Sequence, residues 1–285
     1  MVSRPALRAS QAVLPGLLVL PVVVLVGGLF LAPVLRVLSL SFIEPVPGLG
    51  NYAHLFAEPL YLRIMATTLR VCLWTTALSL LLAYVLAYVM ANVGERARSW
   101  MLIGLLVPFW LSVLVRAFAW TMLLSRTGVV NATLMALGVI DSPLLLLRNE
   151  TGVLIGMVHY MVPYAVLPML TAMLGIDRAL TAAARALGAG PVRTFVSVYL
   201  PLSMPGVLAA AVLVFIFSMG FFITPALLGG GKVMMVAQYI EFGISESTNW
   251  GIATAFASVL LGAVICSLLL VSRFVRIPSL FGAAS

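Results

Sequence analysis

Six apolar stretches of this sequence are long enough to cross a lipid bilayer as helices. They cover residues 12–40, 66–91, 99–124, 152–174, 203–227 and 250–272. A spanning helix needs about 20 apolar residues, because every backbone amide in the hydrocarbon core must find its partner within the chain. With 63% hydrophobic and 8% charged residues, a water-soluble domain of this length would expose too much apolar surface. We therefore expect an all-α integral membrane protein, a single domain over 1–285 with six transmembrane helices.

Charge and cysteine content exclude several function classes. The formal net charge is +8, but the arginines are scattered along the chain rather than gathered into a basic stripe. Nucleic-acid binding usually needs such a stripe, so we expect a lipid bilayer and no nucleic acid as partner. Cys72 and Cys266 lie in separate apolar stretches, which indicates two small buried hydrophobes rather than a disulfide or a metal pair. We predict no metal site.

Two further segments bear on the number of spans. Arg4 and Arg8 precede an apolar run, as in a secretory signal peptide, but the charge-free run over 11–35 is too long for one, so we interpret it as a retained first span. The segment 128–147 is interrupted by polar and turn-forming residues, which predicts short interfacial helices joined by a turn rather than a seventh span. Those interrupting residues are Asn131, Gly138, Asp141 and Pro143.

The charges of the loops predict the orientation, since Lys and Arg are retained on the cytoplasmic side of a membrane. Six spans with a cytoplasmic N-terminus place most of the basic residues inside. We therefore expect both termini, and the loop at about 175–201, to be cytoplasmic. The inside residues are Arg4, Arg8, Arg96, Arg98, Arg178, Arg185, Arg193, Arg273 and Arg276, and the outside ones are Arg63, Arg126, Arg148 and Lys232.

The loop at 175–201 has the pattern of a helix, a sharp turn and a second helix. Good helix formers run from Asp177 to Leu187, and Gly188 stands where a helix C-terminus favours a left-handed residue. Pro191 suits the first turn of a second helix, which we expect to run to about Leu200 and to be stopped by the two prolines that follow, Pro201 and Pro205. Such a loop is either a solvated connection or a docking surface for another protein.

The residues of this loop resemble a known motif. Their spacing is similar to the cytoplasmic "EAA" loop of ATP-binding-cassette (ABC) importer permeases, and the matching positions are Ala183, Ala184, Gly188, Val198, Leu200 and Pro201. The resemblance implies that the loop is a coupling helix seated in a cleft of the ATP-hydrolysing subunit, with Arg185 as a charged flank. The family's glutamate falls on Ala182, so its usual acidic contact is missing here.

Other segments extend the resemblance over nearly the whole chain, and they are similar to spermidine/putrescine-type permeases. They are "NYAHLF" from Asn51, "PFWLSVLVRAFAWTMLLSRTGVVN" from Pro108, "FFITPALLGGGK" from Phe221 and "NWGIATA" from Asn249. This resemblance implies a multi-pass permease of the bacterial inner membrane that is not an enzyme and that moves a small polar solute, with polyamines expected first. Amino-acid-like solutes, phosphonates and other organic anions are the alternatives.

The resemblance also implies a set of partners. These are two copies of a cytoplasmic ATP-binding subunit, a second and non-identical permease subunit, and an external substrate-binding protein. The chain itself is expected to hold no cofactor, because ATP and Mg belong to the partner subunit. The segment "GGGKVMM" from Gly229 does not change this expectation, since Val233 stands where a phosphate-binding loop needs Ser or Thr.

A stand-alone secondary transporter or channel is the competing class. Such proteins often carry internal repeats with matching broken helices, or acidic residues at the membrane midplane for ion coupling. We find no convincing repeat, and none of the six predicted spans contains Asp or Glu. Both observations favour the importer subunit.

Candidate residues for the translocation pathway are charged or aromatic. Arg116 lies one helical turn before Trp120, so the two share a face. If a cationic amine passes, ring faces can hold it by cation–π attraction, with Trp120, Tyr164 and Phe222 as candidates. The negative charge of Glu241 can offset the positive charges of Arg36, Arg70 and Arg116, which we expect in the outer part of the bilayer. We expect Arg36 and Arg70 to reach toward the headgroups, and His159 to be a hydrogen-bonded structural residue. 

Overall fold

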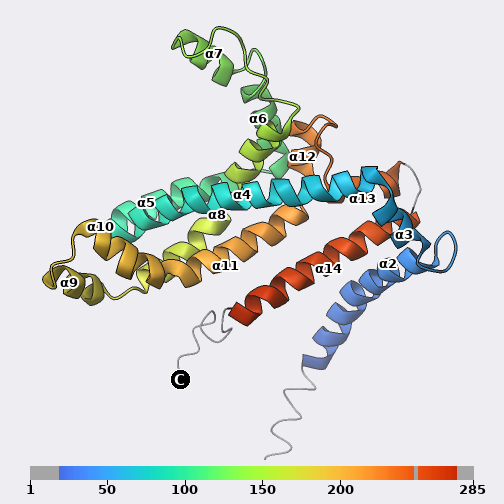
Figure 1. Ribbon diagram of the computed structural model, residues 1–285, viewed down its shortest axis with the longest axis horizontal. Helices are drawn as coiled ribbons and strands as arrows, with labels where there is room; N and C mark the ends of the chain where they lie inside the picture. The colour runs from blue at the N-terminus through green and yellow to red at the C-terminus, as the bar shows by residue number, and fades with distance from the viewer. Residues whose placement is uncertain (1–18, 247–249, 275–285) are drawn as a thin grey trace, which may run out of the picture.

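The computed structural model describes residues 19–246 and 250–274, and the regular structure in these ranges is helical (Figure 1). Five helices are long and apolar enough to span a membrane: Val19–Ile43, Pro59–Asn92, Glu150–Leu174, Pro191–Met219 and Trp250–Leu270. A sixth span is available if the bent pair Glu95–Trp110 and Val113–Leu123 counts as one. The expected all-α membrane fold with six spans is therefore confirmed with one span broken.

Most elements follow one another along the chain with short connections, and a longer one joins α7 to α8. They are η1 (Gly27–Leu31), α2 (Ala32–Ile43), α3 (Gly50–Ala57), α4 (Pro59–Asn92), α5 (Glu95–Leu106), η2 (Val107–Trp110), α6 (Val113–Leu123), α7 (Val129–Ala136), α8 (Glu150–Leu174), α9 (Arg178–Ala186), α10 (Pro191–Thr194), η3 (Phe195–Tyr199), α11 (Leu200–Met219), α12 (Ile223–Leu228), α13 (Val236–Ser245) and α14 (Trp250–Phe274).

The core of the bundle forms around α8, which packs against both α4 and α11 (Figure 1). Small and flexible side chains allow this close approach, because membrane helices associate by packing and not by a hydrophobic driving force between them. The buried residues of this core include Ala83, Ala87, Met161, Ala165 and Val214. α8 is thus the central helix of the bundle, with α4 and α11 packed against it.

Gly206 shows how tightly α11 approaches α8. A Cβ added at Gly206 would lie 2.5 Å from the Cβ of Ala172 and 3.0 Å from the carbonyl oxygen of Pro168. We expect Gly206→Val to destabilise the protein by about 1–3 kcal/mol, because overpacking pushes the two helices apart. Thermal melting of the purified protein in detergent measures this loss. Gly262→Val on α14 is the matched control, since an added Cβ there meets nothing within 4 Å, and equal melting temperatures for the two variants would contradict the expectation.

The predicted third span, 99–124, is not one straight helix. α5 and η2 are bent by 97° from α6. Pro108 explains the break, because its ring removes one backbone donor and clashes with the carbonyl four residues earlier. Leu111 is extended, and the hydroxyl of Ser112 then accepts a hydrogen bond from the backbone N–H of Leu114, which caps the new helix α6.

The helix observed at the predicted fifth span, 203–227, also begins and ends at other residues than expected. Its helix runs without interruption from Pro191 to Met219, so Pro201 and Pro205 do not stop it. The turns over Phe195–Tyr199 are of the wider π type, which gives the ring of Pro201 room beside the carbonyl of the preceding turn. Beyond Met219 the chain turns and forms the separate helix α12.

Two segments at the margins of the bundle complete the fold. The C-terminal part of the first span, α2, packs against α14, and the span diverges from the bundle toward Val19 (Figure 1). Residues 12–18 of the predicted span lie outside the described ranges. The segment 128–147 forms the short helix α7 followed by an irregular stretch, one helix rather than the several expected. Asn131 closes this segment, since its side chain bonds to the backbone of Ser125 and Leu144.

Candidate functional site

The helix and turn expected at 175–201 are present at one end of the bundle, as α9 and α10 (Figure 1). The carboxylate of Asp177 caps α9 by accepting a hydrogen bond of 2.8 Å from the backbone N–H of Ala179. At the other end Gly188 adopts φ of 85°. The N–H of Gly188 bonds to the carbonyl of Arg185, and the N–H of Ala189 bonds to that of Ala184. This is the paired hydrogen-bond pattern of a glycine-terminated helix.

The matched loop residues divide into an outward surface and an inward anchor. Ala182, Ala183, Arg185 and Gly188 are exposed, while Ala184 is half-buried. Val198 and Leu200 are half-buried too, and Pro201 is exposed beside them. The outermost apolar side chain is Leu187, which is 90% exposed. Sequence reasoning did not single out Leu187, although its place directly before Gly188 in the turn could have drawn attention to it.

Aromatic rings connect this loop to the spans. The ring of Tyr88 on α4 lies 5.5 Å from that of Phe195 and 5.2 Å from that of Tyr199, both in an edge-on arrangement. Tyr84, one turn earlier on α4, shares a hydrogen bond of 2.9 Å with the hydroxyl of Ser203 on α11. These contacts pack η3, which follows α10, and the first turn of α11 against α4.

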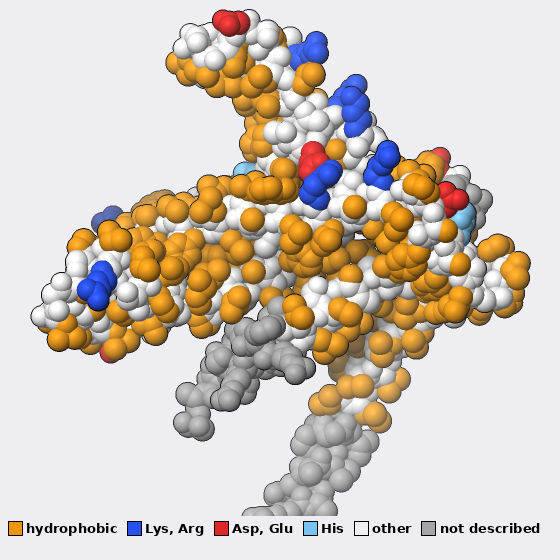
Figure 2. Space-filling model, viewed as in Figure 1, with side chains coloured by type: hydrophobic (Ala, Val, Ile, Leu, Met, Phe, Trp, Pro, Cys, Tyr) orange, Lys and Arg blue, Asp and Glu red, His pale blue; other side chains and the backbone are white. Residues whose placement is uncertain are grey.

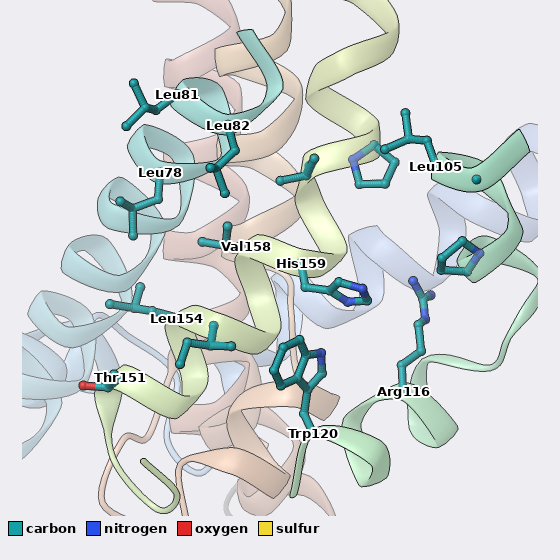
Figure 3. Close-up of a pocket in the computed structure, with 15 residues that line it drawn as sticks. Leu78, Leu81, Leu82, Leu105, Arg116, Trp120, Thr151, Leu154, Val158 and His159 are labelled. Carbon is teal, nitrogen blue, oxygen red and sulfur yellow. The ribbon is translucent and has the colours of Figure 1, made fainter. Parts of the chain in front are cut away.

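A cavity of about 650 Å³, open to the surface beside the exposed Leu81 and Leu82, lies between α4, α8 and the bent α5–α6 pair (Figure 3). Its walls are mainly leucine, valine and proline, and its polar side chains come from α6 and α8. The lining residues include Leu78, Leu105, Arg116, Trp120, Val158 and His159. The side chains of Arg116, Trp120 and His159 converge on one side of the cavity (Figure 3).

Arg116 is the one buried cationic side chain among the described residues, with 8% of its surface exposed. Its guanidinium carbon lies 4.3 Å from the centroid of the Tyr160 ring and 5.7 Å from that of Phe109. Its Nε atom is buried without a hydrogen-bond partner. Within the described ranges the ion pairs are His54–Glu58 and Arg70–Glu150, so the charge of Arg116 is stabilised by ring faces and not by a carboxylate.

The residues predicted for a pathway do not all meet in this cavity. Arg116 and Trp120 line it together, as their spacing indicated. Tyr164 packs its ring against Phe109, Tyr160 and Phe217 behind the cavity wall. The other two predicted residues lie apart, because Phe222 precedes α12 and Glu241 is exposed on α13.

Two further expectations about polar residues are changed by the structure. Arg70 does not simply extend toward the headgroups: its guanidinium donates two hydrogen bonds, of 2.9 and 2.7 Å, to the carboxylate of Glu150. This bidentate pair joins the N-terminal part of α4 to the start of α8. His159, which was expected to be a hydrogen-bonded structural residue, is exposed and lines the cavity with its ring 5.4 Å from that of Trp120.

Sequence reasoning also passed over Tyr160 and Phe109, which hold Arg116. They lie about fifty positions apart on η2 and α8, and no spacing rule joins them. The abundance of aromatic residues in the spans was visible, but which rings face the guanidinium depends on the bend after Pro108. Figure 2 shows the wider setting, in which apolar side chains cover most of the bundle surface and charged ones gather toward its ends and around α6 and α12.

Comparisons with known proteins agree with this architecture. The family model described as "Binding-protein-dependent transport system inner membrane component" matches residues 79–277. The spermidine/putrescine transport system permease protein PotB of Salmonella typhimurium (strain SL1344) is 35% identical over 231 residues, which cover 81% of this chain and 80% of that protein. PotB of Haemophilus influenzae is 33% identical over 255 residues, covering 86% of this chain and 87% of that protein.

A solved structure supports the fold. A chain of a bacterial alginate ABC transporter, crystallised in complex with its alginate pentasaccharide-bound periplasmic protein, superposes with a TM-score of 0.77 at 18% sequence identity. The superposition covers 95% of this chain and 96% of that chain. The arrangement of helices is thus similar to that of a transporter chain whose solute is chemically distant from a polyamine.

Proposed function

The chain belongs to the family of binding-protein-dependent transport system inner membrane components, and on this premise we propose that it carries polyamines such as spermidine or putrescine into the cell. Members of this family are multi-pass permease subunits of ABC importers in the inner membrane, and they are not enzymes themselves. ATP is bound by partner subunits, and a periplasmic binding protein delivers the solute.

The observation that carries the polyamine assignment is the similarity to PotB, which extends over 81% of this chain. The site chemistry is compatible with it. Rings from η2, α8 and the turn after α11 gather beside the cavity, and ring faces attract alkylammonium groups without the tight binding of a carboxylate pair. A transported solute must be able to leave its site, so moderate binding of this kind suits a permease.

For the coupling step we propose that α9 docks on the ATP-binding subunit and receives its motion. The exposed Ala182, Ala183 and Arg185, together with the Gly188 turn, would form the contact. Val198, Leu200 and Pro201 would transmit the motion, because they continue without interruption into α11. Two copies of the ATP-binding subunit and a second, related permease chain would complete the importer.

For the pathway we propose that Arg116 and Trp120 face the solute in the cavity. Tyr164 would support the rings from behind. Phe222 and Glu241 would act elsewhere along the route, nearer to the end of the bundle that carries α12 and α13 (Figure 1). The solute would meet these groups in different conformations of the permease, since alternating access requires two states with different contacts.

Uptake by the complete complex in proteoliposomes tests the proposal. With the binding protein outside and ATP inside, spermidine should accumulate, and a partner subunit that cannot hydrolyse ATP should abolish the accumulation. Uptake that persists without ATP would instead support a self-sufficient transporter. In parallel, polyamines should raise the melting temperature of the partner binding protein, because a ligand that binds only the folded state stabilises it. Stabilisation by amino-acid-like solutes or organic anions alone would overturn the polyamine assignment.

A further inference from the structure

One wall of the cavity contains the guanidinium of Arg116, which packs on two aromatic rings. The guanidinium of Arg116 lies over Tyr160 at 4.3 Å and over Phe109 at 5.7 Å, and its Nε has no hydrogen-bond partner. Tyr160 follows the start of α8 by ten residues, which corresponds to about 15 Å along the helix. The whole of α8 has 25 residues, or about 37 Å, so the cation lies beside the middle part of this apolar helix.

A charge at this depth needs compensation, because an arginine at the centre of a bilayer is unfavourable on every insertion scale. Ring faces supply it here, and cation–π attraction is strongest where water is excluded. The negative face of a ring attracts an ammonium group as well as a guanidinium. The surface that holds Arg116 is therefore also suited to an alkylammonium group.

We propose that the faces of Tyr160 and Phe109, here called the aromatic cage, form a binding site for an alkylammonium group, which the tethered guanidinium of Arg116 occupies until a solute displaces it. This inference rests on the proposed function in taking a polyamine as the solute. Further rings continue the cage: Tyr160 lies 4.6 Å from Phe221 and 5.7 Å from Tyr164. A solute with several amines would find additional ring faces along this cluster.

The cavity offers space into which the side chain of Arg116 can move. Its side chain already borders the cavity of about 650 Å³, and it stands on α6, beyond the 97° bend that separates this helix from the cage residue Phe109. Trp120 lies one turn further along the same helix and faces the same cavity (Figure 3). The guanidinium can therefore move from the cage toward the indole ring without leaving the cavity, and the vacated ring faces become available.

A tethered competitor keeps the site weak, which a permease requires. An intramolecular cation is present at a high effective concentration, so a solute ammonium binds only when its own contacts exceed those of Arg116. The site is then selective for solutes with more than one amine, because a single small cation cannot compete. It also releases its solute readily, since Arg116 returns to the cage.

Equilibrium binding of radiolabelled putrescine to the complete complex in lipid nanodiscs, without the binding protein, tests this proposal. We expect Arg116→Met to tighten putrescine binding by about tenfold, the effect of removing one desolvated cation–π competitor. Replacing a buried charge by an apolar side chain of similar length is usually tolerated. Arg116→Lys retains the tethered cation and should bind putrescine as weakly as the unmodified complex.

Second substitutions separate the cage from a general effect of charge. Adding Tyr160→Leu to Arg116→Met should remove the gain, whereas adding Tyr160→Phe should preserve it, because the ring face remains. Adding Phe217→Leu, which removes a ring that contacts Tyr164 and no cation, should also preserve the gain. The proposal is overturned if Arg116→Met weakens binding, since Arg116 would then support the putrescine site and not compete for it. It is equally overturned if the gain persists with Tyr160→Leu, since the loss of charge alone would explain it.

The outcomes also separate this inference from the proposed function. If the gain appears but the unmodified complex imports no polyamine, the aromatic cage stands and polyamine import is rejected. If ATP-driven polyamine import is found and Arg116→Met brings no gain, the importer assignment stands and the cage is rejected.

Discussion

Gly188→Trp is expected to abolish ATP-driven uptake while the complex still assembles and hydrolyses ATP. Gly188 has φ of 85°, a conformation that costs other residues about 1–2 kcal/mol. A Cβ there would meet no atom within 4 Å, so the first side-chain atom of the new residue meets open space in the permease. The damage falls on the outward surface, where a bulky ring would enter the proposed contact with the ATP-binding subunit. Measuring uptake and ATPase activity together in proteoliposomes shows whether the two are separated.

Two substitutions at Gly188 distinguish backbone strain from bulk. Asparagine tolerates the left-handed conformation better than other residues, so Gly188→Asn should keep most of the coupled uptake. Gly188→Ala introduces the backbone strain with little bulk, so its coupled uptake should lie between those of Gly188→Asn and Gly188→Trp. Intact coupled uptake in Gly188→Trp would show that the turn is not at the coupling contact.

Leu187→Asp is expected to prevent the ATP-binding subunit from copurifying with the permease. Leu187 is 90% exposed at the tip of the turn, and an apolar side chain so placed is suited to a pocket on a partner. Anchors of this kind commonly contribute 2 kcal/mol or more to binding, about a thirtyfold change in affinity. A carboxylate in an apolar pocket would also have to lose its water of hydration.

Leu137 provides a matched control for this substitution. It terminates α7 as Leu187 terminates α9, it is 70% exposed, and a glycine with positive φ follows each of the two. α7 and α9 lie far apart in the fold (Figure 1). Leu137→Asp should therefore leave copurification unchanged. Equal loss in both variants would indicate a general effect of the added charge, and no loss in Leu187→Asp would remove Leu187 from the contact.

The helix and turn within 175–201 could be predicted from sequence because every determinant of their shape is local. Asp177 caps α9, Gly188 ends it, and Pro191 begins the next helix, all within fifteen positions. The end of that next helix could not be predicted in the same way. Pro201 is a stop signal in isolation, but the wider π turn before it relieves the clash and the helix continues into the membrane.

The broken third span shows the limit of hydropathy. Apolar length alone predicted one helix over 99–124, while Pro108 and Ser112 supplied local reasons to divide it. Hydropathy measures whether a segment prefers lipid to water. It gives no information on the direction of the helix axis. After the 97° bend α6 packs against α12, and its side chains Arg116 and Trp120 form part of the cavity wall.

The lipid environment, the membrane segments and the outward helix and turn could be predicted from sequence, because apolar length and local backbone preferences act over neighbouring residues. That Arg116 lies on Tyr160 and Phe109, and that Arg70 pairs with Glu150, could be found only in the folded chain. These partners come from separate helices. Their meeting depends on how α4, α6 and α8 pack, and packing among membrane helices depends on shape and close approach rather than on a pattern that a single segment carries.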